Sequence, residues 1–158
     1  MLSSRILLAV ALGVVLLAPS ASGAEDNQAI VRRYIAEAVN KGNMAVVDEL
    51  VAPTYVGHST VGPEVKGSEA LKQRLTMIRT AFPDLQVTVD DVVADGNKVA
   101  TRTTLRGTHK GEYLGIAPTG KQVTATAIGI THLENGKIKE GWLNSDLLQQ
   151  LNPGLKTK

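Results

Sequence analysis

Hydrophobic residues recur at helical spacing from residue 26 to about residue 82, and this pattern predicts three helices. In the first, an apolar stripe runs from Ile30 to Val39. Asp26 or Asn27 is expected to cap its start, and Gly42 is expected to end it. The expected helices span residues 26–41, 43–52 and 68–82, and the glycine- and proline-containing segment 54–66 is expected to be a loop.

Beyond residue 84 the period changes from helical to alternating, which is typical of half-buried strands. Two tight turns, Asp95–Gly96–Asn97 and Asn135–Gly136, predict hairpins. The expected strands span residues 85–89, 99–105, 123–133 and 137–144, with a glycine-rich loop over 107–120 and a short last helix over 147–151. Helices followed by an antiparallel meander indicate an α+β fold, in which a sheet curved around the first helix leaves a cavity for a small molecule.

Residues 1–24 have the order of a secretory signal peptide. One positive side chain, Arg5, precedes an apolar run that ends at Ala18, and small residues follow. The run is shorter than the ~20 residues that span a bilayer, which favours a cleaved signal over a membrane anchor. Cleavage is expected on one side or the other of Ala24. One domain would then occupy residues 25–158, exported to the periplasm or the surrounding medium.

The composition excludes several classes of protein. Hydrophobic residues make up 43% and charged residues 20% of the 158 residues, as in an ordinary globular domain. The net charge of +2 is dispersed and lacks interleaved aromatic residues, so no nucleic-acid partner is expected. The absence of cysteine excludes disulfides and thiolate chemistry. The three histidines, His58, His109 and His132, lack the spacing of a local metal pair, so no metal site is expected.

The last expected strand carries the densest group of candidate functional residues. One of its faces, by the two-residue period of a strand, carries Ile138, Glu140, Trp142 and Asn144. Two lysines mark the opposite face as solvent-exposed, so the face of Ile138 is expected to point into the cavity. If the strand continues by two residues, Asp146 joins the same row. A carboxyl group in apolar surroundings has a raised pKa and can move a proton near neutral pH.

Simpler roles remain open for the same residues. If Glu140 and Arg102 both face inward they must form an ion pair, because an isolated buried charge is too costly. Ser145 or Asp146 could instead cap the last helix. His132 shares its face with two isoleucines, so it is expected to be at least half buried.

Three stretches of the sequence resemble a known family. They are ATRTTLRGTHKGEYLGIAPTGKQV (residues 100–123), THLENGKIKEGWLNSDLLQQL (131–151) and, more weakly, YVGHSTVGPEVKGSEALKQRL (55–75). Together they resemble the SnoaL-like polyketide cyclases, also called ester cyclases, within the NTF2-like superfamily. The resemblance spans nearly all of the chain beyond the expected signal, and the run Gly-Thr-His…Gly-Ile-x-Pro-Thr-Gly-Lys is its most specific part.

The resemblance implies a cone-shaped α+β barrel, with N-terminal helices packed on a curved, mostly antiparallel sheet, a deep pocket and often a dimer. It also implies ring closure by intramolecular aldol condensation without metal or cofactor, with an aspartate near the end of the last strand as general acid/base. The matching residue is Asp146, four residues after the only tryptophan, whereas Leu143 stands where many relatives carry a further aspartate. The family pattern also places His58 and His109 near the pocket, and Arg102 beneath it.

Two functions are expected on this basis. The first is a cofactor-free enzyme that acts on a small apolar carbonyl compound, as a homodimer, with Asp146, His58 and His109 as its catalytic residues. Substrate-binding roles are assigned to Trp142, Asn144, Arg102 and His132. The second is a secreted protein that holds a small molecule in the same pocket without turning it over.

Overall fold

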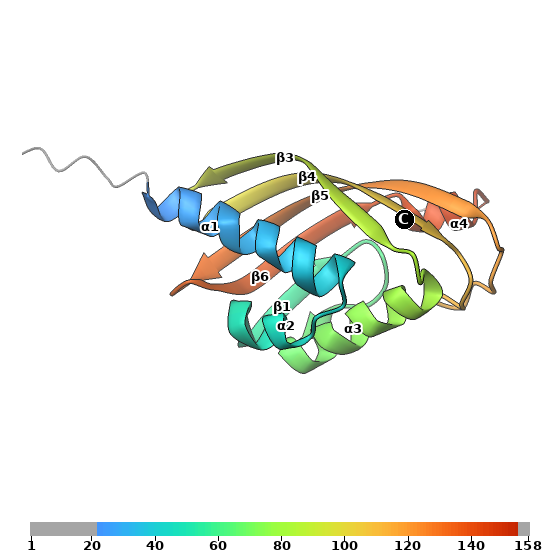
Figure 1. The fold of residues 1–158 in the computed structure, drawn as a ribbon, viewed down its shortest axis with the longest axis horizontal. Coiled ribbons are helices and arrows are strands. Elements are labelled where there is room, and N and C mark those ends of the chain that lie inside the picture. The colour runs from blue at the N-terminus through green and yellow to red at the C-terminus, as the bar shows by residue number, and fades with distance from the viewer. Residues whose placement is uncertain (1–21, 155–158) are drawn as a thin grey trace, which may run out of the picture.

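A computed structural model describes residues 22–154, in which helices cover one face of a curved six-stranded sheet (Figure 1). The α+β prediction is confirmed. The predicted signal peptide lies almost entirely outside the described residues. In chain order the elements are α1 (Ser22–Arg33), η1 (Tyr34–Asn40), α2 (Ala45–Leu50), β1 (Val51–Ser59), β2 (Val65–Lys66), α3 (Ser68–Ala81), β3 (Gln86–Asp95), β4 (Lys98–Thr108), β5 (Gln122–Glu134), β6 (Lys137–Ser145) and α4 (Leu147–Leu151).

The first predicted helix is confirmed as α1 continued by η1, a stretch of wider π-helical turns. It begins at Ser22, so neither Asp26 nor Asn27 caps it. It ends where predicted, because Gly42 takes a φ of +70°, a left-handed conformation that side chains disfavour. A Cβ on Gly42 would also lie 2.7 Å from Nε of Arg79, which donates hydrogen bonds to the carbonyls of Val39 and Asn40 at the end of η1.

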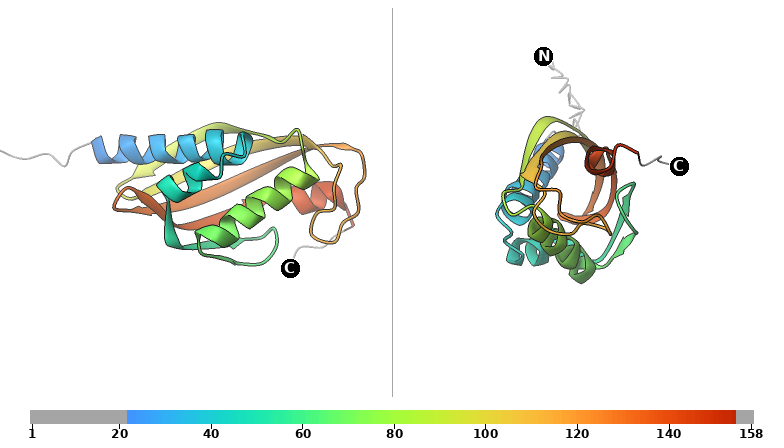
Figure 2. Two further views of the ribbon diagram at one scale, coloured as in Figure 1. Left: turned by 60° about the horizontal axis from the view of Figure 1, so that its bottom comes forward. Right: turned by 90° about the vertical axis from the view of Figure 1, so that its right-hand side faces the viewer.

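The strands form one sheet in the order β2-β1-β6-β5-β4-β3. The pair β1–β6 is parallel and the other four pairs are antiparallel, so the sheet is mixed but mostly antiparallel. Both predicted hairpins are confirmed. In the second, Asn135 and Gly136 have φ values of +51° and +72°, as a two-residue turn between twisted strands requires. Viewed along its length, the sheet curls, with α1, α2 and α3 on its open side (Figure 2).

The predicted loop over residues 54–66 is wrong, because this segment contains most of β1 and all of β2. The second helix is also shorter than predicted, since α2 ends at Leu50 and Val51 begins β1. Pro53 lacks an N–H and interrupts the local alternation, so the segment resembles a loop when it is considered alone. It becomes a strand through pairing with β6, more than 80 residues further along the chain.

A bulge in β6 decides which side chains face the helices. Between the pairs Leu133–Ile138 and His132–Glu140, β6 has one residue more than β5, so Lys139 is the inserted residue. One inserted residue reverses the alternation of faces along the rest of the strand. Ile138 therefore lies in the core, whereas Glu140 lies on the outer face of the sheet.

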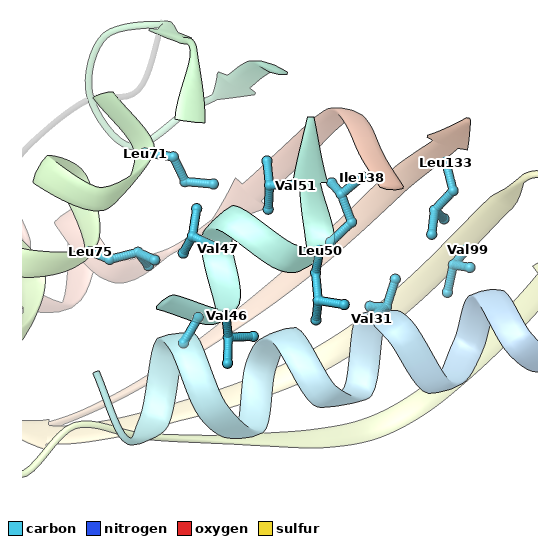
Figure 3. Close-up of a cluster of buried hydrophobic side chains, with 11 residues drawn as sticks. Val31, Val46, Val47, Leu50, Val51, Leu71, Leu75, Val99, Leu133 and Ile138 are labelled. Carbon is cyan, nitrogen blue, oxygen red and sulfur yellow. The ribbon is translucent and has the colours of Figure 1, made fainter. Parts of the chain in front are cut away.

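Two clusters of buried side chains hold the helices to the sheet. The first joins α1, η1, α2 and α3 to the ends of β4, β5 and β6, and Figure 3 shows Val31 and Leu50 on the side of the sheet residues Val99 and Leu133. The second surrounds Phe82 and connects α3 and the loop after β4 to α4. In the part of the chain that the structure describes, no helix is long and apolar enough to cross a membrane.

Candidate functional site

A cavity of about 260 Å³ lies between the helices and the inner face of the sheet. Members of both core clusters line it, and most of its wall is aliphatic. Its polar lining consists of three tyrosines, Arg74, His58 and the hydroxyl side chains of β1, β4, β5 and β6. Among the described residues no aspartate or glutamate lines this cavity. The cavity therefore offers an apolar ligand several hydroxyl donors and a positive charge, but no carboxylate.

Two tyrosines bring hydroxyl groups to the wall near η1 and β1. Removal of its hydroxyl from water raises the pKa of Tyr34 far above the ordinary value. Burial, and then the negative charge of Glu140, raise the pKa of Tyr55 to about 12. Both hydroxyls are consequently protonated at neutral pH, and they can donate hydrogen bonds to a ligand oxygen.

Two glycines make room for the ring of Tyr55. A Cβ on Gly57 would lie 2.7 Å from the Tyr55 hydroxyl, and one on Gly141 would lie 2.9 Å from it. Gly57 and Gly141 are cross-strand partners of β1 and β6 on the inner face. A larger residue at either position would push the tyrosine out of its place in the cavity wall.

The β6 bulge turns Glu140 and Asn144 to the outer side of the sheet, whereas Trp142, in the same row, still borders the cavity. Gly141 and Ser145 line the cavity, and Leu143 borders it too. Asn144 lies opposite Ile128, which is 62% exposed. The prediction that Glu140, Trp142 and Asn144 share the inward face of Ile138 is wrong, because Lys139 is inserted between them.

His58 is held by carboxylates on both sides. Its Nε2 lies 2.8 Å from Oε1 of Glu140, and its Nδ1 lies 3.0 Å from Oε2 of Glu64. The imidazole also stacks on Trp142, with 5.4 Å between ring centroids and 22° between planes. His58 and Trp142 border both the inner cavity and a more open outer hollow of about 440 Å³. The structure thus brings these two predicted residues together, at the boundary between the two faces of the sheet.

Asp146 lies at the end of β6, half-buried, between two residues that line the cavity. Its Oδ1 accepts a hydrogen bond of 2.6 Å from the N–H of Thr126, and its Oδ2 accepts one of 3.1 Å from Gln150. Ser145 accepts the N–H of Leu147 at the start of α4. The carboxylate of Asp146 is therefore held between β5 and α4, and it is not itself part of the cavity wall.

Arg102 and Glu140 do not form the expected ion pair. Arg102 is exposed on the outer face and contacts Asp91 at 2.7 Å and Asp90 at 3.3 Å. Asp90 is the inserted residue of a bulge in β3, and this bulge lets two successive aspartates reach one guanidinium. The condition of the pairing prediction, that both side chains face inward, is not met: the β6 bulge turns Glu140 outward, and Arg102 lies on the face of β4 opposite Thr101 and Thr103, which line the cavity.

The other two histidines lie away from the cavity wall. His132 is more than half buried, as predicted, and its Nε2 lies 2.7 Å from the amide nitrogen of Asn97. His109 is fully buried and stacks on Phe82 with 5.2 Å between ring centroids. Its Nδ1 accepts the N–H of Thr119, and this bond closes the glycine-rich loop over itself. Among the described residues, no group of three or more His, Asp or Glu side chains is arranged to hold a metal ion.

Three tyrosines and an arginine that line the cavity were not singled out from the sequence: Tyr34, Tyr55, Tyr113 and Arg74. Tyr34 does belong to the apolar stripe of the first helix, and a polar hydroxyl within such a stripe is the signal that could have identified it. Tyr55 lies in the segment predicted as a loop, so no face could be assigned to it. Arg74 interrupts the apolar side of the third helix, which is a weak indication of a buried charge.

The family model and the curated relatives that match this chain are those of polyketide and ester cyclases. The model of the SnoaL-like polyketide cyclase family matches residues 29–152. Among curated proteins, the aklanonic acid methyl ester cyclase AcmA of Streptomyces galilaeus is 29% identical over 113 residues, which are 70% of this chain and 77% of the relative. DnrD of Streptomyces peucetius, also an aklanonic acid methyl ester cyclase, is 27% identical over 115 residues, 70% of this chain and 78% of the relative.

Solved structures show the same fold. A candidate SnoaL-like polyketide cyclase from Jannaschia sp. CCS1 superposes with a TM-score of 0.77 at 22% identity, over 87% of this chain and 99% of that one. IdmH from Streptomyces antibioticus, described as a candidate polyketide cyclase, is 32% identical with a TM-score of 0.68, over 79% of this chain and 97% of IdmH. The fold is therefore of the NTF2-like type expected from the sequence.

Proposed function

The chain belongs to the SnoaL-like polyketide cyclase family, and from that premise we propose that it is a cofactor-free enzyme that closes a ring in a small carbonyl compound. The observation that carries the proposal is the helix-covered cavity, whose wall is apolar and has hydroxyl donors within it. Intramolecular aldol condensation needs a group that moves a proton at the carbon next to a carbonyl, and donors for the enolate oxygen. The curated relatives are named as cyclases of aklanonic acid methyl ester, so this ester is the first substrate to test.

The proposed oxygen donors are Tyr34 and Tyr55. Their hydroxyls stay protonated because burial raises both pKa values, so they stabilise a developing enolate without losing their own protons. Hydrogen bonds of this kind are stronger in an apolar cavity than in water, because the surroundings screen charge weakly. The aliphatic wall would also exclude water, which competes for the same donors.

The proposed general acid/base is Asp146. It stands four residues after Trp142, where the family resemblance places its aspartate, and Ser145 and Leu147 on either side of it line the cavity. To reach a substrate, its carboxylate must leave the hydrogen bonds from Thr126 and Gln150. Thr126 and Gln150 are therefore part of the proposal, since they hold the carboxylate in its resting position.

The test is Asp146→Asn, assayed by product formation from aklanonic acid methyl ester. Loss of the proton-moving group is expected to lower turnover by about two to four powers of ten, with little change in melting temperature. Asp95→Asn is the control, because Asp95 is exposed at the far end of β3. If Asp146→Asn loses stability but keeps turnover, Asp146 only joins β5 to α4, and the catalytic assignment fails.

A second candidate function is a ligand-binding protein without turnover. The observation that favours it is that no carboxylate of the described residues lines the cavity. This candidate predicts that the wild-type protein binds the ester and releases it unchanged. Quantifying bound ester and product in the same sample separates the two functions.

We also propose that two copies of the chain pair through the outer face of the sheet. This face carries exposed apolar side chains from three strands and is not covered by α1, α2 or α3 (Figure 2). Exposed apolar groups of this kind are typical of an interface. The edge of such an interface would have charges of both signs, supplied by Arg102 with Asp91 and by His58 with Glu64.

A further inference from the structure

We propose that the ligand of the cavity is a small amphipathic carboxylate, and that Arg74 pairs with its anionic group. This inference rests on the proposed role of the cavity as a ligand site. It differs from that proposal in the class of ligand, because it replaces a neutral carbonyl compound by an anion. It does not require that the ligand be turned over.

The charge of the cavity wall is the first argument. Arg74 and His58 are the charged or titratable basic side chains among the described lining residues, and no acidic residue lines the wall beside them. The guanidinium of Arg74 remains protonated at any physiological pH. An anion close to this cation is attracted to it more strongly in apolar surroundings than in water, because those surroundings screen charge weakly. The wall therefore favours an anionic ligand over a neutral or cationic one.

The hydrogen bonds of Arg74 are the second argument. Its Nη1 donates to the carbonyl of Val61 at 2.7 Å, and its Nη2 donates to the carbonyl of Pro63 at 2.8 Å. A third hydrogen bond joins Arg74 to the phenol of Tyr113. All three acceptors are neutral, and three bonds still leave some of the five N–H donors of a guanidinium for a ligand. By contrast, Arg33 and Arg102 each contact two carboxylates. Within the part of the chain that the structure describes, Arg74 forms no such ion pair.

Tyr113 adds a second donor at the same place. Burial raises its pKa, and the hydrogen bond from Arg74, followed by the charge of Arg74, offsets part of that rise. The phenol stays protonated at neutral pH. Tyr113 lines the cavity together with Arg74. A guanidinium beside a phenol is suited to the two oxygens of one carboxylate, since charged acceptors form the stronger hydrogen bonds.

The volume limits the apolar part of the ligand. A cavity of ~150 Å³ holds a benzene molecule, so one of about 260 Å³ has room for a bicyclic ring. A matched pair of probes follows from this size: 2-naphthoate and methyl 2-naphthoate. They share the same rings, and at pH 7 they differ in the negative charge of the acid.

The experiment is isothermal titration calorimetry of both probes at pH 7, on the full chain and on Arg74→Gln. The wild-type protein is expected to bind the acid about ten- to a hundredfold more tightly than the ester, the usual effect of hydrogen bonds to a charged group. Arg74→Gln is expected to lose this preference while its affinity for the ester stays within about twofold of wild type. Arg106→Gln, a change at an exposed arginine on the outer face, is expected to keep the preference.

The outcomes separate this inference from the proposed function. Equal affinity for acid and ester, or a preference that survives in Arg74→Gln, would overturn the inference and leave the cavity as a ligand site. Failure of both probes to bind would overturn the inference, whereas the proposed function is decided separately by the turnover of Asp146→Asn. If Arg74→Gln does not fold, Arg74→Lys is measured instead. Lysine keeps the positive charge but lacks the planar guanidinium, so the affinity for the acid relative to the ester should fall about tenfold. An unchanged ratio of the two affinities would overturn the assignment of Arg74.

Discussion

At the scale of single residues, the imidazole of His58 has a carboxylate oxygen on each side, from Glu140 at 2.8 Å and from Glu64 at 3.0 Å. With both ring nitrogens engaged, no nitrogen is left to contact a ligand directly. Glu64 lies in the turn before β2, so the imidazole links that turn to β6. His58 therefore joins two structural elements, and the catalytic role expected from the sequence would require one of the two carboxylates to move away.

Replacing Glu140 by glutamine tests the strength of that link. The side chains of His58 and Glu140 are 35% and 33% exposed. Loss of the ion pair between them should therefore lower the free energy of unfolding by at most about 1 kcal/mol. An inward-facing pair with Arg102 would have cost roughly 3–5 kcal/mol. Urea unfolding measures the difference, with the exposed Glu112→Gln as control. A loss near the larger figure would mean that Glu140 is buried after all.

The same variant has a second readout at Tyr55. The charge of Glu140 is the smaller of the two causes that raise the pKa of this tyrosine, after burial. Removing the charge should therefore lower the pKa from about 12 toward the ordinary value of 10.0 without reaching it. Phenolate absorbance during an alkaline titration follows this change.

At the scale of secondary-structure elements, Asp84 fixes the end of β4 to the turn between α3 and β3. Its carboxylate accepts the N–H and the hydroxyl of Thr108, each at 2.7 Å. The backbone bond first, and then the hydroxyl bond, lower the pKa of Asp84 below its ordinary value of 3.8. The glycine-rich loop leaves β4 directly after Thr108, so this contact sets where the loop begins.

The pH dependence of stability should reveal this contact. Because the folded-state pKa is lowered, the stabilisation by Asp84 is fully present above its unfolded-state pKa, near 3.8, and is lost as the pH falls through the lower folded-state value. Asp84→Asn should therefore be less stable than wild type at pH 7, and the difference should shrink on acidification below pH ~4. Melting temperatures from pH 7 to pH 2 measure this, with Asp95→Asn as control. A difference that is the same at every pH would exclude a role for the charge.

At the scale of the whole molecule, the outer face of the sheet carries its most exposed apolar side chains. Val93 is 67% exposed, Ile128 62%, Ile130 44% and Trp142 41%. They come from β3, β5 and β6, and they lie on the face opposite the helices. Water contact at such side chains is unfavourable, and a second copy of the same face would remove it.

Sedimentation velocity tests the proposed pairing. The wild-type protein is expected to sediment as a dimer at micromolar concentration, and Ile128→Lys as a monomer, because a lysine charge would be buried in the interface. Thr124→Lys places the same charge on the same face near the end of β5 and is the control. A monomeric wild type, or a dimeric Ile128→Lys, would contradict the proposal.

The sequence by itself determined the helices, strands and turns that form between residues close together in the chain. Helical spacing located α1 with η1 and α3, alternation located four strands, and Asn135–Gly136 fixed a hairpin. These signals are local because helical hydrogen bonds and tight turns join residues close together in the chain. The family was also evident, since the run from Gly107 to Lys121 resembles its most specific stretch. The signal peptide and export remain predictions, since no structural observation bears on them.

The tertiary structure decided which side chains meet. β1 becomes a strand only beside β6, and the inserted residue Lys139 moves Glu140 and Trp142 to the outer face. A two-residue period has no tolerance for one extra residue, and whether β6 carries that residue depends on how β5 and β6 pair beyond their hairpin turn. Arg74 lines the cavity only because the curled sheet packs against α3 and completes the wall to which α3 contributes. The pairing of β1 and the make-up of the cavity wall are therefore properties of long-range contacts, and the faces of β6 depend on a bulge that the pattern of residues does not reveal.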